Sequence, residues 1–270
     1  MFDRILLVLD EPGDLETLLH YVRGLARPGK SRVTILKTVP FFETIVDMPS
    51  ELAPEADGDV ESEEAFVTAI AEALKADGID AEGSTIVGHS GLAIAAAAER
   101  VGATLIVVGA QPLPRNESLL HAVSIPLVAV PSAARVLGSR ILSTPEALPG
   151  ALQMADAFRS EIILLHLPGS GARPPGAAVV ADLLVCSGNP AAEIERAFEK
   201  LGIGMIAVSS EGSPDELTRC LLREAPLPLL VVRRAPRRDE PESSPPKVVD
   251  LWRRRRTSAN PLEGVGQVED

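Results

Sequence analysis

The residues that could take part in chemistry lie where short apolar runs end. The run TLIVVG ends on Gly109, where a chain that cradles a phosphate needs further glycines and a hydroxyl. Pro112 and Pro114 follow instead, and each removes a backbone N–H that could have bound a phosphate oxygen. Asp10 directly follows the run RILLVL and could either contact a ligand or cap the next helix.

The other reactive side chains form no recognisable catalytic or metal-binding set. The four histidines lie in separate predicted elements, without a partner at ligand spacing, and we interpret them as structural. They are His20, His89, His121 and His166. Cys186 and Cys220 fit no paired metal spacing and are interpreted as buried thiols. Because a Walker loop and a Gly-x-Ser-x-Gly elbow are also missing, the sequence predicts no enzyme activity and no metal site.

The segment 41–64 concentrates nine carboxylates. It lacks the alternating ligands and the central glycine of a calcium loop, so we interpret it as a solvated flap. Its apolar side chains need a surface to pack on, either in the second part of this chain or in a partner chain. They are Phe41, Phe42, Ile45, Val46, Met48 and Leu52.

Charge separates the C-terminal tail from the rest of the chain. The net charge is −12, yet residues 1–232 hold 17 Lys/Arg against 31 Asp/Glu, whereas residues 233–256 hold 9 against 4. The acidic part should repel nucleic acid. Arg253–Arg256 could contact nucleic acid, an anionic membrane or an acidic protein, or remain solvated. The composition of residues 235–270 predicts disorder.

The chain repeats one pattern twice. ERVGATLIVVGA (99–110) matches EKLGIGMIAVSS (199–210), and IPLVAV (125–130) matches LPLLVV (227–232). We therefore expect two units, residues 1–135 and a shorter unit at 136–234, followed by the tail at 235–270. The absence of an apolar run of about 20 residues and an N-terminus unlike a signal peptide favour the cytoplasm.

Within a unit, strand and helix periods alternate, which predicts an α/β fold with a mostly parallel sheet. Strands are expected at 4–9, 32–39, 82–87, 104–109 and 126–130, helices over 15–25, 66–77 and 91–101, and a brief turn at 116–123. In the second unit a helix is expected over 189–202, capped by Asn189, with Phe198 facing the sheet and Gly202 in the left-handed conformation. Too few residues precede the strand expected at Ala181 for the preceding helix, so this unit lacks one helix.

This order of elements, together with STIVGHSGLAIAAAAERVGATLIVVGA, resembles the universal stress protein family over about residues 1–234. The second unit resembles a degenerate member. The resemblance implies a doubly wound, Rossmann-like sheet of five parallel strands in each unit. It also implies a pseudo-dimer formed through the two last strands, and it leaves a homodimer open.

The resemblance also implies which residues would contact a nucleotide. Members of the family that bind nucleotides carry Gly, two residues, Gly, nine residues, and Gly-Ser or Gly-Thr after the fourth strand. This chain keeps only Gly109 in the first unit and Gly212 with Ser213 in the second, and both loops are shorter. Asp10 matches the family's acidic residue, while Gly88 and Gly188 are interpreted as turn residues. ATP would be the cofactor; the short loops predict that none is bound.

We therefore predict a non-catalytic stress-response or regulatory protein that acts through protein contacts. One alternative is an ATP- or AMP-binding sensor that uses Asp10 and Gly109. Another is an enzyme of the wider adenine-nucleotide hydrolase fold group, for which no catalytic constellation is found. A third is an adaptor whose basic tail reaches nucleic acid or membrane.

Overall fold

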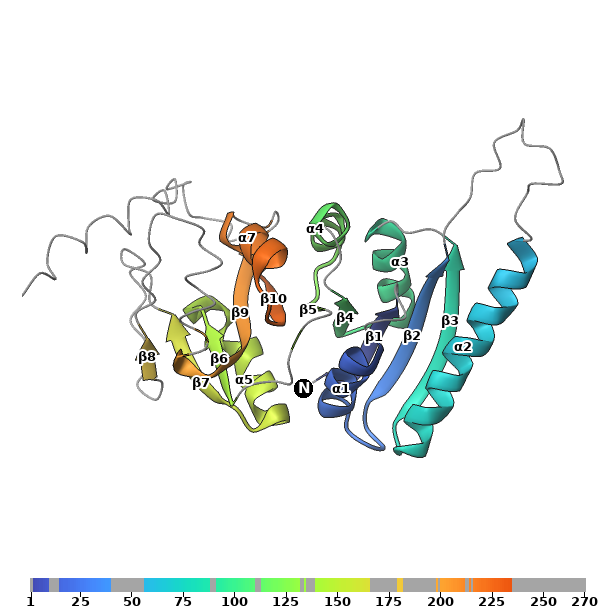
Figure 1. Ribbon diagram of the computed structural model, residues 1–270, viewed down its shortest axis with the longest axis horizontal. Coiled ribbons are helices and arrows are strands. Elements are labelled where there is room, and N and C mark those ends of the chain that lie inside the picture. Colours follow the sequence, from blue (N-terminus) through green and yellow to red (C-terminus); the bar gives the residue numbers. More distant parts are fainter. Residues whose placement is uncertain are drawn as a thin grey trace, which may run out of the picture.

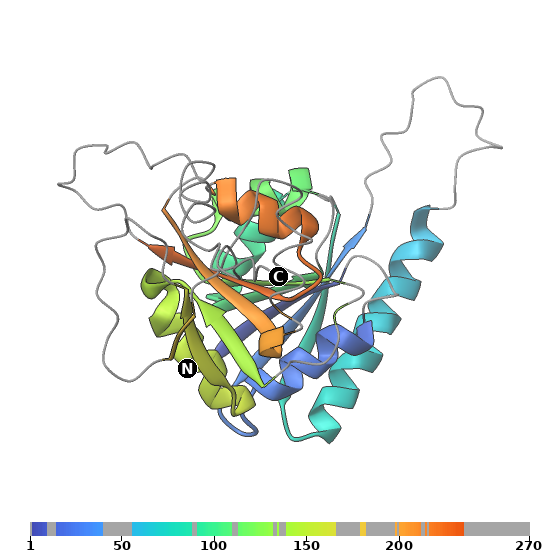
Figure 2. The same cartoon turned by 60° about the vertical axis from the view of Figure 1, so that its left-hand side comes forward.

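The computed structural model describes residues 2–9, 15–39, 56–87, 91–109, 113–131, 134, 139–165, 179–181, 198, 200–211, 214 and 216–234. These residues form one ten-stranded sheet with helices on both faces (Figure 1). The sheet twists strongly along its length, as Figure 2 shows. The predicted α/β class with a mostly parallel, Rossmann-like sheet is confirmed. The tail, including Arg253–Arg256, lies outside the described residues.

The first half of the sheet has the strand order β3-β2-β1-β4-β5, and all its neighbouring pairs are parallel. These strands are β1 (Arg4–Leu9), β2 (Arg32–Val39), β3 (Asp80–Val87), β4 (Leu105–Gly109) and β5 (Leu127–Val130). Its helices are α1 (Leu15–Leu25), α2 (Ala56–Ala76), α3 (Gly91–Val101) and α4 (Leu113–Ala122). The apolar stripes that predicted α1 and α2 are the faces these helices bury.

The second half repeats the same order, β8-β7-β6-β9-β10, when read from its outer edge. Its strands are β6 (Arg140–Ser143), β7 (Glu161–Leu165), β8 (Val179–Ala181), β9 (Ile203–Glu211) and β10 (Leu229–Arg234). Its described helices are the short η2 (Pro145–Ala147), α5 (Leu148–Phe158) and α7 (Glu216–Glu224). The connection between β7 and β8, residues 166–178, lies outside the described residues, so the missing helix stays a prediction.

Three local expectations are corrected. Residues 116–122 belong to the ten-residue helix α4 rather than to a brief turn, because Leu119 and Leu120 are buried on one helical face. The last nine residues of the acidic segment 41–64 are the start of α2, where carboxylates suit the positive helix N-terminus. The strand expected at Ala181 ends there, since β8 covers Val179–Ala181.

In the predicted helix at 189–202, Phe198 is buried in the core and Gly202 has a left-handed φ of 63°, as expected. Asn189 lies outside the described residues. Helix α5 was missed by the sequence analysis. None of the described helices is long and apolar enough to cross a membrane.

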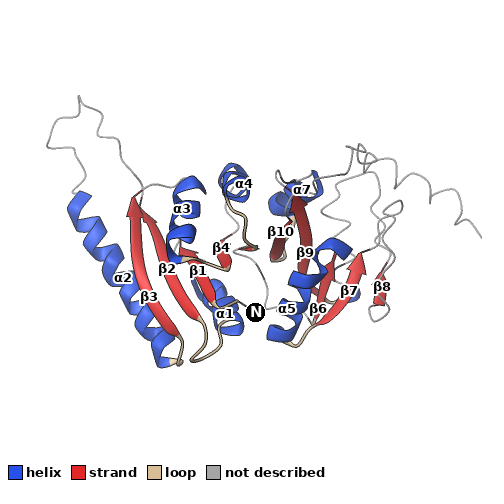
Figure 3. Cartoon of the chain, turned by 180° about the vertical axis from the view of Figure 1, so that it is seen from behind, coloured by secondary structure: helices blue, strands red, loops and turns tan. Residues whose placement is uncertain are grey.

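The two halves meet along one seam. β5 and β10 pair antiparallel, with Leu229 opposite Ala129, so the expected pairing of the two last strands is present. On one face of the sheet α1 packs against α5, and on the other face α4 packs against α7 (Figure 3).

Polar contacts tie the seam together on both faces. Arg27 pairs with Asp156 at 2.9 Å on the α1–α5 face, and Arg219 pairs with Glu117 at 2.9 Å on the α4–α7 face. Arg233 of β10 donates from Nε to the carbonyl oxygen of Val123, which directly follows α4, at 3.0 Å. Burial lowers the pKa of Arg233. Both ion pairs are largely exposed and each is worth at most about 1 kcal/mol, so the apolar core carries most of the seam's stability.

The α1–α5 contact is unusually close at Gly24. A Cβ atom placed on Gly24 would overlap the ring of Phe158, which also packs edge-on against Tyr21 with ring centroids 5.7 Å apart. Helix propensity alone would favour alanine over glycine in the interior of α1. We therefore infer that glycine is needed at position 24 because a larger residue would overlap Phe158.

We predict that Gly24→Ala lowers the free energy of unfolding by about 1–3 kcal/mol, since the added methyl overpacks the contact. In a Phe158→Ala background the same change should be neutral or stabilising by up to about 1 kcal/mol, the helix-propensity gain. Urea unfolding of the four proteins measures both values. Equal effects of Gly24→Ala in the two backgrounds would show that Phe158 is not the obstacle.

Tyr21, the chain's single tyrosine, is fully buried in α1, and its hydroxyl has no hydrogen-bond partner among the residues that the structure describes. Burial raises the pKa of Tyr21 above its ordinary value of 10.0, because the phenolate would lose its hydration. The unfolded chain therefore releases this proton at a lower pH than the folded protein. The ionisation of Tyr21 therefore leaves the free energy of unfolding unchanged below about pH 10 and lowers it as the pH rises further.

We predict that Tyr21→Phe leaves stability at neutral pH unchanged or raises it by up to about 1 kcal/mol, because the lost hydroxyl was unpaired. The variant should also lose less stability than the wild type between pH 10 and pH 11.5. Chemical denaturation across this range, with the ultraviolet absorbance of tyrosinate as a direct readout, tests it. Tyrosinate in the folded wild type at pH 10 would contradict the prediction.

Candidate functional site

The expected ligand site of the first half lies where the strand order reverses, between β1 and β4. The two strands are parallel neighbours, with Val8 opposite Val108, so their carboxyl ends lie side by side. In doubly wound sheets, ligands bind beyond the carboxyl ends at such a point. Gly109 lies there, buried and paired with Val130 of β5. Asp10 follows β1 directly but lies outside the described residues, as do Gly88 and Gly188.

The connection from β4 to α4 is short. β4 ends at Gly109 and α4 begins at Leu113, so only residues 110–112 join them. A phosphate-binding loop presents several successive backbone N–H groups to the anion. Pro112 in the connection and Pro114 in the first turn of α4 have none to offer. The sequence of this connection and of the first turn of α4 thus has two positions without a backbone N–H.

The nearest alternative donors, at the N-terminus of α3, are packed against α4. A Cβ atom placed on Gly91, the first residue of α3, would clash with the backbone nitrogen of Leu119 and the hydroxyl of Ser118. Glycine permits this close approach because it has no side chain. The neighbouring Leu92, in contrast, has 69% of its surface exposed. The first turn of α3 thus supports a helix contact on the side that faces α4.

In the second half, β9 continues beyond the position that corresponds to Gly109. Ser209 corresponds to Gly109 in the repeat, yet β9 extends to Glu211 and pairs with β10 as far as Arg234. Ser210 is buried and accepts a hydrogen bond from Nη1 of Arg233 at 3.2 Å. Residues that could have formed a loop are therefore part of the sheet. Gly212 and Ser213 lie outside the described residues.

In the second half Thr144 directly follows β6, as Asp10 directly follows β1, whereas the alignment of RILLVL with RILSTP places Glu146 at the position of Asp10. Its backbone N–H donates to the carbonyl oxygen of Ala207 at 3.0 Å, which ties the end of β6 to β9. Thr144 is only 8% exposed, and its hydroxyl makes no hydrogen bond and does not cap η2. The carboxylate of the second half, Glu146, lies in the first turn of η2, which Thr144 precedes.

A buried lysine at the end of β2 was not singled out from the sequence. Lys37 is 7% exposed, and its Nζ lies 3.7 Å from Oε1 of Glu63 in α2. Its signal was a cation within the apolar strand RVTILKTV. Since a buried charge needs a partner, this pair holds α2 against the sheet.

The structure brings no catalytic set together among the residues it describes. His20 and His121 are exposed on separate helices, and Cys220 is half-buried in α7. No cluster of three His, Cys, Asp or Glu side chains that could hold a metal occurs in the described part of the chain. His89, His166 and Cys186 lie outside it.

Comparisons with known proteins agree with this geometry. Residues 1–131 match the universal stress protein family. A universal stress protein from Archaeoglobus fulgidus has a similar structure, with a TM-score of 0.60 at 18% identity over 86% of this chain and 99% of that one. A protein of unknown function from Pseudomonas aeruginosa PAO1 reaches a TM-score of 0.59 at 14% identity, over 94% and 95% of the two chains. No curated protein matches the sequence.

The fold is that of a doubly wound α/β protein, in which the strand order reversal between β1 and β4 is the expected place for a ligand. Residues 1–131 form a domain of the universal stress protein family. The TM-scores and the coverage of these two solved structures show a shared fold that extends over both halves of this chain. At identities of 18% and 14%, they show the fold alone.

We predict that Gly91→Ala lowers the free energy of unfolding by about 1–3 kcal/mol, because backbone atoms of α4 must move to accept the methyl group. Leu92→Ala, one residue further on, should change it by less than about 0.5 kcal/mol because Leu92 is mostly exposed. Denaturant unfolding gives both values. Similar, small effects would show that α3 and α4 are not held in contact at Gly91.

Proposed function

We propose that the protein is a non-catalytic regulatory member of the universal stress protein family that acts through protein contacts without binding ATP. The match of residues 1–131 to the family supports a role in stress responses. The proposed setting is the cytoplasm, where the thiol of Cys220, which forms no disulfide, would remain reduced.

The observation that carries the proposal is the three-residue connection between Gly109 and Leu113. Binding a triphosphate needs several N–H donors or cations around its oxygens, because a charge of about −4 must be compensated on leaving water. The short connection offers few donors, and α4 packs against one side of the first turn of α3 at Gly91. In the second half, Ser210 and Glu211 are part of β9.

Two exposed leucines are candidate contact points for a protein partner. Leu92 on α3 and Leu152 on α5 are 69% and 54% exposed, whereas the other large apolar side chains of the described residues are at least partly covered. Single exposed leucines are common on protein surfaces, so these two indicate where to look and not which partner binds.

We predict that isothermal titration calorimetry detects no binding of ATP, ADP or AMP at nucleotide concentrations up to about 1 mM. The protein as purified should also release no nucleotide on denaturation. A micromolar dissociation constant for any of the three would replace this proposal with the sensor that uses Asp10 and Gly109.

A double variant, Pro112→Gly with Pro114→Ser, is the matched test of the cause. It restores two backbone donors without lengthening the connection, and we expect no gain in ATP binding. Binding by this variant alone would show that the prolines, and not the length, exclude the nucleotide.

A further inference from the structure

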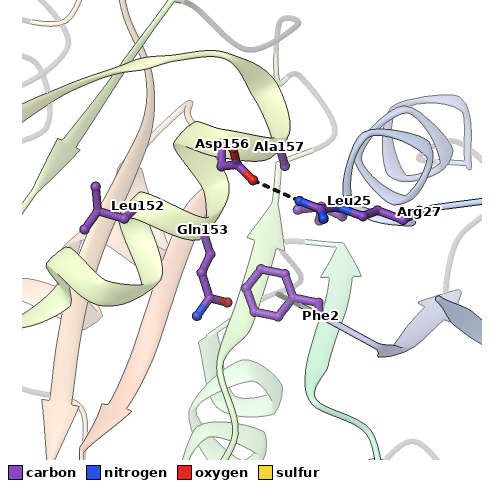
Figure 4. Close-up of a pocket in the computed structure, with 7 residues that line it drawn as sticks. All are labelled: Phe2, Leu25, Arg27, Leu152, Gln153, Asp156 and Ala157. Atoms are coloured by element: carbon purple, nitrogen blue, oxygen red, sulfur yellow. Dashed lines mark hydrogen bonds and ion pairs between the residues drawn. The ribbon is translucent and has the colours of Figure 1, made fainter. Parts of the chain in front are cut away.

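A pocket of about 210 Å³ opens on the seam between the two halves, at the α1–α5 contact (Figure 4). Its apolar lining comes from both halves: Phe2 and Leu25 from the first, Leu152 and Ala157 from the second. Phe2 and Leu25 are buried in the core, whereas Leu152 is 54% exposed at the opening. A molecule in this pocket would therefore touch both halves at once.

The polar lining consists of Arg27, Gln153 and Asp156. Nη2 of Arg27 donates to Oδ2 of Asp156 at 2.9 Å, the dashed line in Figure 4. Among the described residues the Arg27 guanidinium makes this one hydrogen bond. The N–H groups on Nη1 and Nε are therefore available to donate to a ligand. A guanidinium binds a carboxylate well because two of its N–H groups match the two oxygens.

The volume restricts what could bind. An engineered apolar cavity of about 150 Å³ holds one benzene molecule, whereas drug-sized ligands occupy about 300–1,000 Å³. A pocket of about 210 Å³ is thus too small for a nucleotide and large enough for one ring with a short polar group.

The charges around the pocket permit an anion. Arg27 and Asp156 compensate each other within the lining. Lys30, three residues after Arg27, and Arg159, two after Ala157, are both exposed, and Asp3 beside Phe2 is the opposing carboxylate. Arg159 has a left-handed φ of 52°, whereas α2 and α3 are followed by glycines in that conformation, Gly78 and Gly102. Arg159 is thus an exposed cation two residues after the lining residue Ala157 in the sequence.

From the apolar lining, the free donors of Arg27 and the volume, we propose that this pocket binds a small monocyclic aromatic carboxylate. The ring lies against Phe2, Leu25 and Leu152, and the carboxylate accepts hydrogen bonds from Arg27. This site is separate from the strand order reversal and does not depend on the function proposed above.

The test compares phenylacetate with phenylacetamide, its neutral analogue of nearly equal shape, using calorimetry and ligand-detected NMR on the full chain. Phenylacetate should bind with a dissociation constant of about 1 mM or below, as expected for ten non-hydrogen atoms. Phenylacetamide should bind about tenfold more weakly. No binding of phenylacetate at 10 mM, or equal binding of the two, overturns the proposal.

Two variants that break the same ion pair identify the role of Arg27. Arg27→Gln should abolish the preference for the carboxylate. Asp156→Asn should retain or increase it severalfold, because it frees the guanidinium and removes the competing negative charge. If both variants reduce phenylacetate binding equally, Arg27 does not contact the ligand and the proposal fails.

A second pair locates the site. Leu152→Trp fills the opening and should weaken phenylacetate binding at least tenfold, whereas Leu92→Trp, a change at the other exposed leucine, should leave it unchanged. Equal binding by the Leu152→Trp variant and the wild type would place the ligand elsewhere and overturn the assignment.

Discussion

The antiparallel pairing of β5 with β10 is the constraint on which the rest of the structure depends. Through it two five-stranded halves become one sheet, and each apolar cluster continues from one half into the other. The helices at the seam must then pack closely, which explains why α1 has Gly24 where the Phe158 ring approaches. The ion pair of Arg27 with Asp156 lies at the edge of this apolar contact and fixes its register more than its strength.

The same close packing determines what the carboxyl ends of the strands can do. A nucleotide site needs space between the strand ends and the helices, and it needs backbone donors that face that space. In the first half three residues separate the end of β4 from the start of α4, and α4 packs against the first turn of α3 at Gly91. In the second half the residues after Ser209 extend β9 and hydrogen-bond with β10. The described residues at this edge thus pack against a helix in the first half and pair with a strand in the second.

Much of this could be predicted from the sequence, because the informative signals were periodic. The apolar stripes of α1 and α2 and the strand RILLVL predicted the elements, and the hundred-residue repeat predicted two units. The pairing of the halves followed only from the resemblance to the family. The helix α4 was mistaken for a turn because only Leu119 and Leu120 mark its buried face over ten residues. The pocket at the seam was not predictable, since Phe2 and Leu152 are 150 positions apart and meet only through tertiary packing. Of the candidate nucleotide contacts, only Gly109 is among the described residues, and the roles of Gly109, Asp10, Gly212 and Ser213 all remain predictions.

The seam joins two parts of one polypeptide, and this has a consequence for the amount of protein present. An interface between separate subunits dissociates on dilution, whereas a tethered interface experiences an effective concentration of about millimolar at any dilution. The continuous sheet therefore persists whether a cell holds a few copies or many. It also allows the two halves to differ in sequence: Ser209 can stand in the second half where the first has Gly109, which no symmetric homodimer allows.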